Sequence, residues 1–202
     1  ALLAVMPMLS IAQSYVVRPA PPPTNAVPIP SVGWRAGTVP INTPNTHNGV
    51  DQVINQAVRR DIYHWQSFDI GSQSSVTFNM PDAASSALNR VENSTAPGQV
   101  FGKLSSTIPG ANGSRVAGGS LYLINQNGIL FSPTAQVNVG SLIASTLNLN
   151  DDDFRSGLVN SIQDKLPTFK YDGAPELFTN DRNFVRVDPG ATITTAGGGR
   201  VY

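Results

Sequence analysis

The sequence predicts an all-β fold of the solenoid type, in which short strands wind into stacked coils. The first observation behind this prediction is the run Gly119–Gly140, where two strand-like stretches, Ser120–Asn125 and Ile129–Phe131, are joined at Asn127-Gly128. Asn-Gly is a strong turn signal, because Asn tolerates and Gly prefers a positive φ. Small and polar residues separate the stretches, as expected for a backbone that turns corners repeatedly.

The second observation is that this pattern of strand, corner and strand returns along the chain in altered form. Val76 and Phe78 alternate with polar neighbours, Ala135–Val139 alternates in the same way, and residues 190–202 repeat the shape. Degenerate repeats of about one coil's length are typical of solenoids. We expect the repeats to continue beyond Tyr202.

The composition limits the function classes. Only 13% of the residues are charged and the formal net charge is zero, so we expect no nucleic-acid partner. The mean hydropathy of −0.09 predicts no integral membrane segment. The chain has no cysteine, which excludes disulfides and thiolate metal sites. Asn, Ser, Thr, Gln and Gly supply the polar surface, and such residues suit β-solenoids because they stack in ladders along successive coils.

Two segments precede the expected solenoid. Ala1–Ser14 is apolar, short and ends in small residues, so we interpret it as the remnant of a signal peptide, with a buried strand or helix as the alternative. Residues 15–61 are predicted to form a Pro-rich arm or linker. Eight of the sixteen prolines fall between Pro19 and Pro44, and proline favours an extended backbone.

Residues 49–63 are ambiguous. We expect at most a short helix before Arg59 and a strand from Ile62, so that the solenoid domain spans 62–202. Asn48 is a candidate cap for the helix. The helical interpretation depends on five apolar residues at helical spacing, namely Val50, Val53, Ile54, Ala57 and Val58.

The repeat is interrupted over residues 150–186. Asp151–Asp153 opens a polar segment, Ser156–Leu166 is predicted to form one or two helical turns, and Leu166–Gly173 has the pattern of a strand followed by a turn. An insertion that leaves the coil and packs on its side explains this pattern best.

The sequence indicates no catalytic, cofactor-binding or metal-binding residues. Asp151–Asp153 lack the alternating spacing of a calcium loop and are expected in a solvated loop. Gly197–Gly199 are followed by no Lys-Ser/Thr, so a solenoid corner is favoured over a phosphate loop. Neither of the two histidines has zinc-site spacing or a nucleophile elbow nearby. We expect Trp65 and Phe68 in the core or as end caps, with carbohydrate stacking as the alternative.

The segment Asn125-Gln126-Asn127-Gly128-Ile129 resembles the Asn-Pro-Asn-Gly-Ile motif of the two-partner secretion domain, the haemagglutination-activity domain of filamentous-haemagglutinin-like exoproteins. The resemblance covers roughly residues 62–202, and the order of its pieces is more specific than any single piece. The other matching pieces are Trp65–Gly71, Ser75–Asn79, Ala87–Val91, Val100–Leu104 and Ala135–Leu147.

Two departures indicate a divergent member of this family. Gln126 stands where proline is usual, which loosens the turn because proline would preset φ. The family's Asn-Pro-Asn-Leu motif is missing from Leu104–Val116. Asn125–Ile129 is therefore the candidate secretion motif, and it acts either as a folding element or by direct contact with the partner.

The resemblance implies a right-handed parallel β-helix that serves as the N-terminal secretion domain of a large, adhesin-like exoprotein. The implied partner is an outer-membrane β-barrel transporter with periplasmic partner-binding modules. The implied location is secreted or at the cell surface, reached through the periplasm of a Gram-negative-type bacterium. We expect a monomer without a cofactor, whose folding outside the cell templates later coils.

Two other functions remain open. An adhesin module that binds host glycan or protein directly is disfavoured by the low charge and few aromatics. A polysaccharide-cleaving β-helix enzyme is disfavoured because Asp and Glu number only 13 and concentrate in loops. We therefore expect no enzymatic activity.

Overall fold

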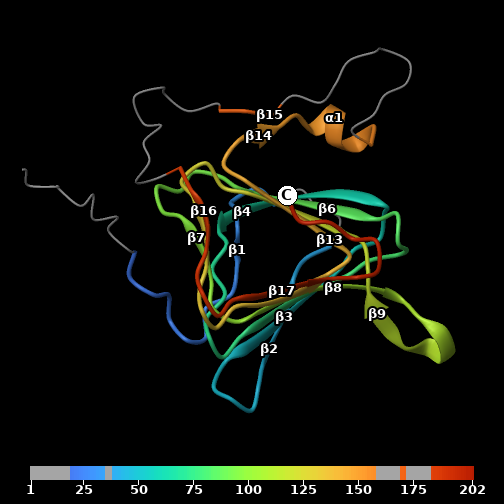
Figure 1. Ribbon diagram of the computed structural model, residues 1–202, viewed down its shortest axis with the longest axis horizontal. Helices are drawn as coiled ribbons and strands as arrows, with labels where there is room; N and C mark the ends of the chain where they lie inside the picture. Colours follow the sequence, from blue (N-terminus) through green and yellow to red (C-terminus); the bar gives the residue numbers. More distant parts are fainter. Residues whose placement is uncertain (1–18, 35–37, 158–168, 172–182) are drawn as a thin grey trace, which may run out of the picture.

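Short strands wind into successive coils that stack along one axis. The computed structural model describes residues 19–34, 38–157, 169–171 and 183–202, so the expected signal-peptide remnant, 1–14, lies outside the described residues. Viewed along the stack, the molecule has a triangular cross-section, with one sheet on each side (Figure 1). The strands of neighbouring coils pair in parallel. This confirms the expected right-handed parallel β-helix, since parallel crossovers are right-handed.

Sheet I is the longest of the three and follows the order β2-β3-β5-β8-β12-β17. Its strands are β2 (Ile41–Pro44), β3 (Val50–Asn55), β5 (Ser75–Asn79), β8 (Lys103–Pro109), β12 (Gln136–Val139) and β17 (Thr192–Thr195). Side chains alternate across a strand, so one apolar row faces inward, with Val76, Leu104, Val137 and Ile193 in register.

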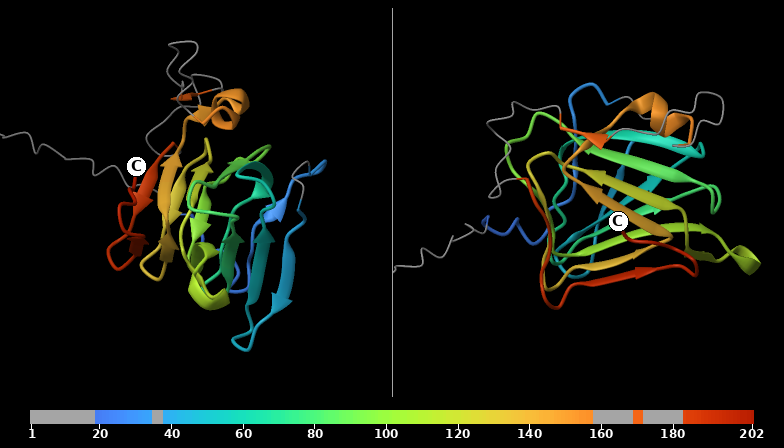
Figure 2. Two further views of the ribbon diagram at one scale, coloured as in Figure 1. Left: turned by 90° about the vertical axis from the view of Figure 1, so that its right-hand side faces the viewer. Right: turned by 45° about the horizontal axis from the view of Figure 1, so that its top comes forward.

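Sheets II and III complete the coils, and Figure 2 shows the stack from the side. Sheet II follows the order β1 (Ile29–Pro30), β4 (Arg60–Ser67), β6 (Ser86–Val91), β10 (Ser120–Ile124) and β13 (Ser141–Ser145). Sheet III follows the order β16 (Val185–Val187), β11 (Ile129–Phe131) and β7 (Gly98–Val100). The inward side chains of all three sheets form one hydrophobic core.

The Pro-rich region lies against the first coil. β2 pairs antiparallel with β3 and β1 pairs antiparallel with β4, so these segments cover edges that would otherwise expose unpaired backbone groups. Trp34 packs edge-on against Trp65, with the ring centroids 4.9 Å apart. The segment is extended, as proline dictates, and it forms part of the stack's first end.

Residues 49–63 contain no helix, which agrees with the expectation of at most a short one, but they are strand from Val50, which corrects the expected start of the strands at Ile62. Val50–Asn55 form β3, ahead of the strand expected from Ile62, and Asn48 lies in the β2–β3 turn with a φ of 62°. Parallel pairing of β3 with β5 satisfies the backbone groups of both strands. This tertiary pairing, together with the β-branched Val and Ile residues, outweighs a weak helical spacing.

The interruption after β13 is an insertion on the side of the stack, as expected. β14 (Asn148–Leu149) pairs antiparallel with β15 (Phe169–Lys170), and both lie with helix α1 (Asp151–Arg155) outside the triangle, next to sheet II (Figure 1). Phe154 and Leu149 are buried in a second hydrophobic cluster. Sheet II contributes Ile62, Leu88, Tyr122 and Ile124 to this cluster.

Helix α1 lies ahead of the stretch Ser156–Leu166 that was expected to be helical. Asn150 caps it, because its side chain accepts hydrogen bonds from the backbone N–H groups of Asp152 and Asp153 at 2.8 and 3.3 Å. Asp151–Asp153 thus form the first turn of α1 and not a solvated loop. Their negative charges stabilise the helix, because its N-terminus carries the positive end of the helix dipole. Residues 158–168, most of the expected helical stretch, lie outside the described residues. No helix in the described ranges is long and apolar enough to cross a membrane.

A hairpin projects from the corner where β8 of sheet I leads on toward β10 of sheet II (Figure 1). The far end of β8 pairs antiparallel with β9 (Arg115–Ala117) around the 3-10 turn η1 (Ala111–Gly113). Arg115 holds the hairpin to the stack by donating to the carbonyl oxygens of Thr107 and Met80 at 2.7 and 3.0 Å.

Candidate functional site

The Asn125–Ile129 segment forms the tight corner between β10 in sheet II and β11 in sheet III. The backbone N–H of Gly128 donates to the carbonyl oxygen of Asn125 at 3.0 Å, which closes a four-residue turn. Of the Asn127-Gly128 pair, only Gly128 has a positive φ, 113°, which glycine adopts without strain.

Two asparagine side chains fix this turn. Asn125 is buried; its Oδ1 accepts from the backbone N–H of Asn127 at 2.9 Å, and its Nδ2 donates to the carbonyl oxygen of Ala96 at 3.2 Å. The Nδ2 of Asn127 donates to the carbonyl oxygen of Ser94 at 2.7 Å. Short amide side chains are suited to such local backbone bonds, so both residues act here as parts of the backbone scaffold.

The turn connects three successive coils. The carbonyl oxygen of Gly128 accepts from the backbone N–H of Gly98 in the preceding coil at 3.0 Å. The backbone N–H of Asn125 donates to the carbonyl oxygen of Ser145 in the following coil at 3.1 Å. Ile129 ends the segment and is fully buried in the core. Changes in the turn therefore reach the coils on both sides.

Among the residues of the turn, Gln126 has the least complete set of hydrogen bonds within the described residues. Its carbonyl oxygen accepts a hydrogen bond from the side chain of Asn183. Its Nε2 is buried and has no hydrogen-bond acceptor among the described residues. An unpaired buried donor costs free energy, so glutamine at this position is a locally unfavourable replacement for the proline of the family motif.

A polar hollow of about 290 Å³ opens beside the turn. Its rim includes Glu92, whose Oε1 lies 2.6 Å from the Nδ1 of His64. The hollow is small and mixed in charge, which suits hydrogen bonding to a polar partner better than binding of an apolar ligand. Its lining includes Arg90, Glu92, Ser94, Gln126, Asn127 and Asn148.

Arg90 connects the hollow to the side insertion, and the sequence did not reveal this role. The Nε of Arg90 donates to Asn148 Oδ1 and its Nη2 donates to the carbonyl oxygen of Leu149, both at 2.7 Å. The same Nη2 lies 2.7 Å from Oδ1 of Asp151. Strand alternation places Arg90 with Leu88 on the outer face of β6, but its partners follow more than fifty residues later in the chain.

Trp65 and Phe68 lie in the core and are at most 1% exposed. Their rings pack edge-on with centroids 5.6 Å apart. Trp65 also donates from Nε1 to the Oδ1 of buried Asn89 at 3.0 Å, and Asn89 in turn donates to the carbonyl oxygen of Tyr122 at 3.2 Å. At this burial neither ring is open to stack against a carbohydrate.

The two histidines lie apart from each other. His64 belongs to β4 and pairs with Glu92, whereas His47 lies exposed in the β2–β3 turn. Within the described part of the chain, no group of three or more His, Asp or Glu side chains is placed to hold a metal ion.

Comparison with known proteins identifies one matching family model. The TPS secretion domain matches residues 34–187, which is well over half of the chain. This range begins at Trp34 and ends at the last residue of β16. It therefore includes the first coil, the Asn125–Ile129 turn and the side insertion.

Named relatives and a solved structure agree with this match. Two proteins of Haemophilus influenzae named heme/hemopexin-binding protein are each 38% identical, over 101 and 85 residues. The matched stretches cover 50% and 42% of this chain but only 10% and 8% of those proteins. The crystal structure of the HMW1 secretion domain from Haemophilus influenzae superposes with a TM-score of 0.56 at 22% identity, covering 81% of this chain and 36% of that one. This last likeness shows that the fold is shared.

Proposed function

The chain belongs to the TPS secretion domain family, and from this premise we propose how it acts in two-partner secretion. Its role is that of a secretion domain, the part of an exoprotein that directs export. The part of the chain that matches the curated relatives covers only about a tenth of their length. We propose that it is the N-terminal domain of a large, adhesin-like exoprotein.

The proposed partner is a dedicated outer-membrane β-barrel transporter with periplasmic partner-binding modules. Those modules would recognise the chain before it has closed into coils, by adding a strand to its unpaired edges. On the far side of the membrane, each coil would then satisfy the backbone groups of the next. Burial and backbone pairing drive such folding without nucleotide hydrolysis.

We propose that the Asn125–Ile129 turn serves secretion by fixing the fold, and not by touching the transporter. The observation that supports this is that both asparagine amides are already bonded within the protein. Asn125 is buried, and the Nδ2 of Asn127 donates to the carbonyl oxygen of Ser94 in the preceding coil. The amides of both residues thus join neighbouring coils.

Secretion of the chain behind a complete signal peptide tests the proposed role. We expect the folded chain in the medium of cells that carry the cognate transporter, and accumulation in the periplasm of cells that lack it. Equal release from both kinds of cell would overturn the secretion role.

The Asn127→Ala variant then tests the role of the turn. If the turn acts through the fold, secretion and the free energy of unfolding should fall together, and growth at lower temperature should restore secretion. Asn138→Ala is the matched control, because Asn138 is exposed on β12, outside the Asn125–Ile129 turn. Loss of secretion by Asn127→Ala at full stability would indicate direct transporter contact instead.

A further inference from the structure

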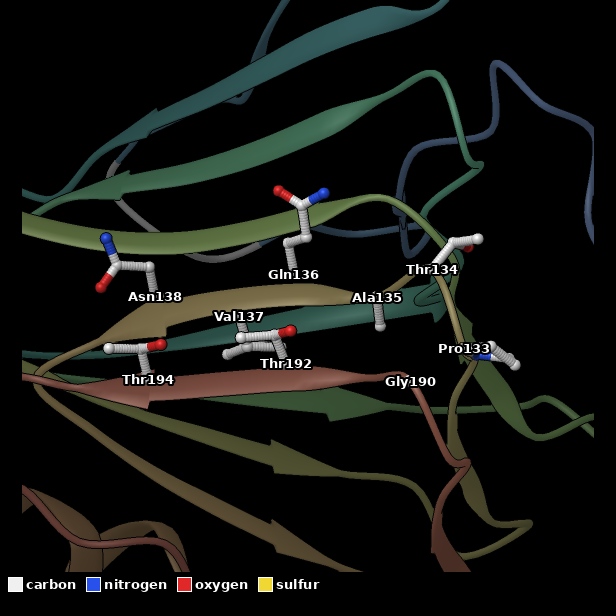
Figure 3. A pocket seen from close by; sticks show the side chains of 9 residues that line it. All are labelled: Pro133, Thr134, Ala135, Gln136, Val137, Asn138, Gly190, Thr192 and Thr194. Atoms are coloured by element: carbon white, nitrogen blue, oxygen red, sulfur yellow. The ribbon is translucent and has the colours of Figure 1, made fainter.

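A polar groove follows the corner where sheet III passes into sheet I. It consists of two adjoining hollows of about 470 and 490 Å³, which share Thr134 and Gln136 in their linings. The first hollow extends over the earlier coils from the β2–β3 turn, and the second extends to β17 (Figure 3). The groove therefore runs along the axis of the stack and crosses successive coils.

One row of side chains follows this groove from coil to coil. The row has one residue from each of five successive strands of sheet I, and these residues are in register: Asp51, Ser75, Lys103, Gln136 and Thr192. Neighbouring strands lie about 4.8 Å apart, so the row extends over about 19 Å. Its repeat is close to the length of one sugar residue in an extended β-linked glycan.

Several polar groups of the groove make no hydrogen bond within the described protein. Lys103 and Gln136 are exposed, and neither side chain makes a hydrogen bond within the described residues. Asn138, Thr192 and Thr194 are likewise exposed in the second hollow, where Figure 3 shows their side chains on β12 and β17. These amides, hydroxyls and an ammonium group remain available to a ligand.

A second polar row on the same sheet, Asn55, Asn79 and Thr107, differs from the groove row because its side chains bond one another. Asn79 donates from Nδ2 to Asn55 Oδ1 at 2.8 Å, and Thr107 donates to Asn79 Oδ1 at 2.8 Å. Arg115 in turn donates to the hydroxyl of Thr107 at 2.7 Å. Away from the groove, these polar side chains thus bond one another from coil to coil, whereas Lys103, Gln136 and Thr192 of the groove row make no such bond within the described residues.

The groove has nearly balanced charge. The hydroxyl of Ser75 donates to Asp51 at 2.7 Å and Asn45 donates to it at 3.2 Å. These bonds, helped by the charge of Lys103, hold the pKa of Asp51 below its usual range. One carboxylate and one ammonium group therefore face a groove that is otherwise neutral, which favours a neutral ligand over an acidic polymer.

We propose that this groove binds an extended, neutral, β-linked polysaccharide along the axis of the stack. Sugar hydroxyls both donate and accept hydrogen bonds, so they match a row that alternates amide, hydroxyl and charged groups. No Phe, Tyr or Trp is among the described residues that line the groove, so affinity rests on hydrogen bonds, and we expect a Kd on the order of 1 mM. The site lies at a different corner from the Asn125–Ile129 turn and is independent of the secretion role.

Isothermal titration of the folded chain with cellohexaose and chitohexaose tests the proposal. We expect binding to at least one of them that changes little with salt, because the ligand is neutral. Gln136→Ala and Lys103→Ala should each weaken binding about three- to tenfold, without changing the unfolding midpoint. Gln66→Ala is the matched control, since Gln66 is exposed on β4 in sheet II.

Three results would overturn the proposal. The first is no binding of either hexasaccharide at several times the expected Kd. The second is binding that Gln136→Ala and Gln66→Ala weaken equally, which would place the ligand elsewhere. The third is displacement of the sugar by an extended neutral peptide of higher affinity, which would assign the groove to a polypeptide. Secretion of the Gln136→Ala chain should remain normal in every case, so the two proposals fail separately.

Discussion

At the residue scale, the Asn125–Ile129 turn shows how a few side chains determine a corner. Asn125 and Asn127 donate their amides to backbone carbonyl oxygens, and Gly128 provides the positive φ. Gln126 is the exception, because its buried Nε2 has no acceptor in the described ranges. The departure from the family motif at this residue therefore has a physical cost.

Replacing Gln126 with proline should stabilise the fold. Proline is favoured at the second position of such a turn and restricts the unfolded chain, so Gln126→Pro should raise the free energy of unfolding by about 0.5–1 kcal/mol. Urea unfolding measures the change. Gln126→Ala is the control, since it removes the buried amide without restricting φ. A lower urea midpoint for the proline variant would show that the turn's φ does not suit proline.

Also at the residue scale, the partly buried Asp69 should make the free energy of unfolding depend on pH. Burial raises the pKa of Asp69, although its Oδ1 accepts from the backbone N–H of Gln99 at 2.9 Å. A raised native pKa means that the folded chain binds the proton more tightly than the unfolded chain does, so Asp69 lowers stability once pH rises above its unfolded value. Asp69→Asn should therefore stabilise the protein at neutral pH and lose that advantage at a pH below about 4. Urea unfolding at both pH values checks this, and a constant difference would contradict it.

At the element scale, the side insertion is held by one buried cation and one buried ring. Arg90 binds Asn148, the carbonyl oxygen of Leu149 and Asp151. Phe154 packs edge-on against Tyr122, with the ring centroids 5.3 Å apart. Both contacts join the insertion to the outer face of sheet II, whose apolar residues would otherwise be exposed to water.

Removing the cation should release the insertion more than it unfolds the coils. Arg90→Ala leaves Asp151 without its partner, and Asp151 is partly exposed, so we expect a loss of about 2–3 kcal/mol. Limited proteolysis should cut the variant within the insertion while the coil stack stays intact. Arg155→Ala, an exposed arginine on α1, is the control. Equal protease resistance in both variants would show that Phe154 alone anchors the insertion.

At the scale of the whole molecule, stability passes from coil to coil. Each coil contacts mainly its neighbours, as in other solenoids, so the first end of the stack needs its own cover. Trp34 provides part of it by packing on Trp65 and Tyr63, with centroids 4.9 and 5.7 Å away. The β2 and β1 pairings close the same end.

Truncating this cover should loosen the first coil selectively. Trp34→Ala removes a half-buried aromatic, so we expect a loss of about 1–3 kcal/mol. Hydrogen exchange should speed up in β3 and β4 and change little in β10 and β13. Trp34→Phe should recover most of the protection. Uniformly faster exchange would indicate that the stack unfolds as a single unit.

The sequence by itself determined the fold class, one corner of the coils and the position of the side insertion. Period-two alternation, Gly and Asn at corners and degenerate repeats predicted a β-solenoid, because side-chain direction and turn chemistry are local properties; the resemblance to the family implied the parallel β-helix. The same local evidence predicted the corner at Asn127-Gly128 and the side insertion. The order of these pieces indicated the family, which the family comparison then showed.

Only the tertiary structure decided which residues meet across coils. Residues 50–55 form a strand despite their helical spacing, because β3 pairs in parallel with β5. Arg90 makes hydrogen bonds with residues more than fifty positions later in the chain. The polar groove likewise exists only once strands from five coils lie in register. Local propensity differs between conformations by less than about 1 kcal/mol per residue, so burial and pairing between distant segments settle such choices.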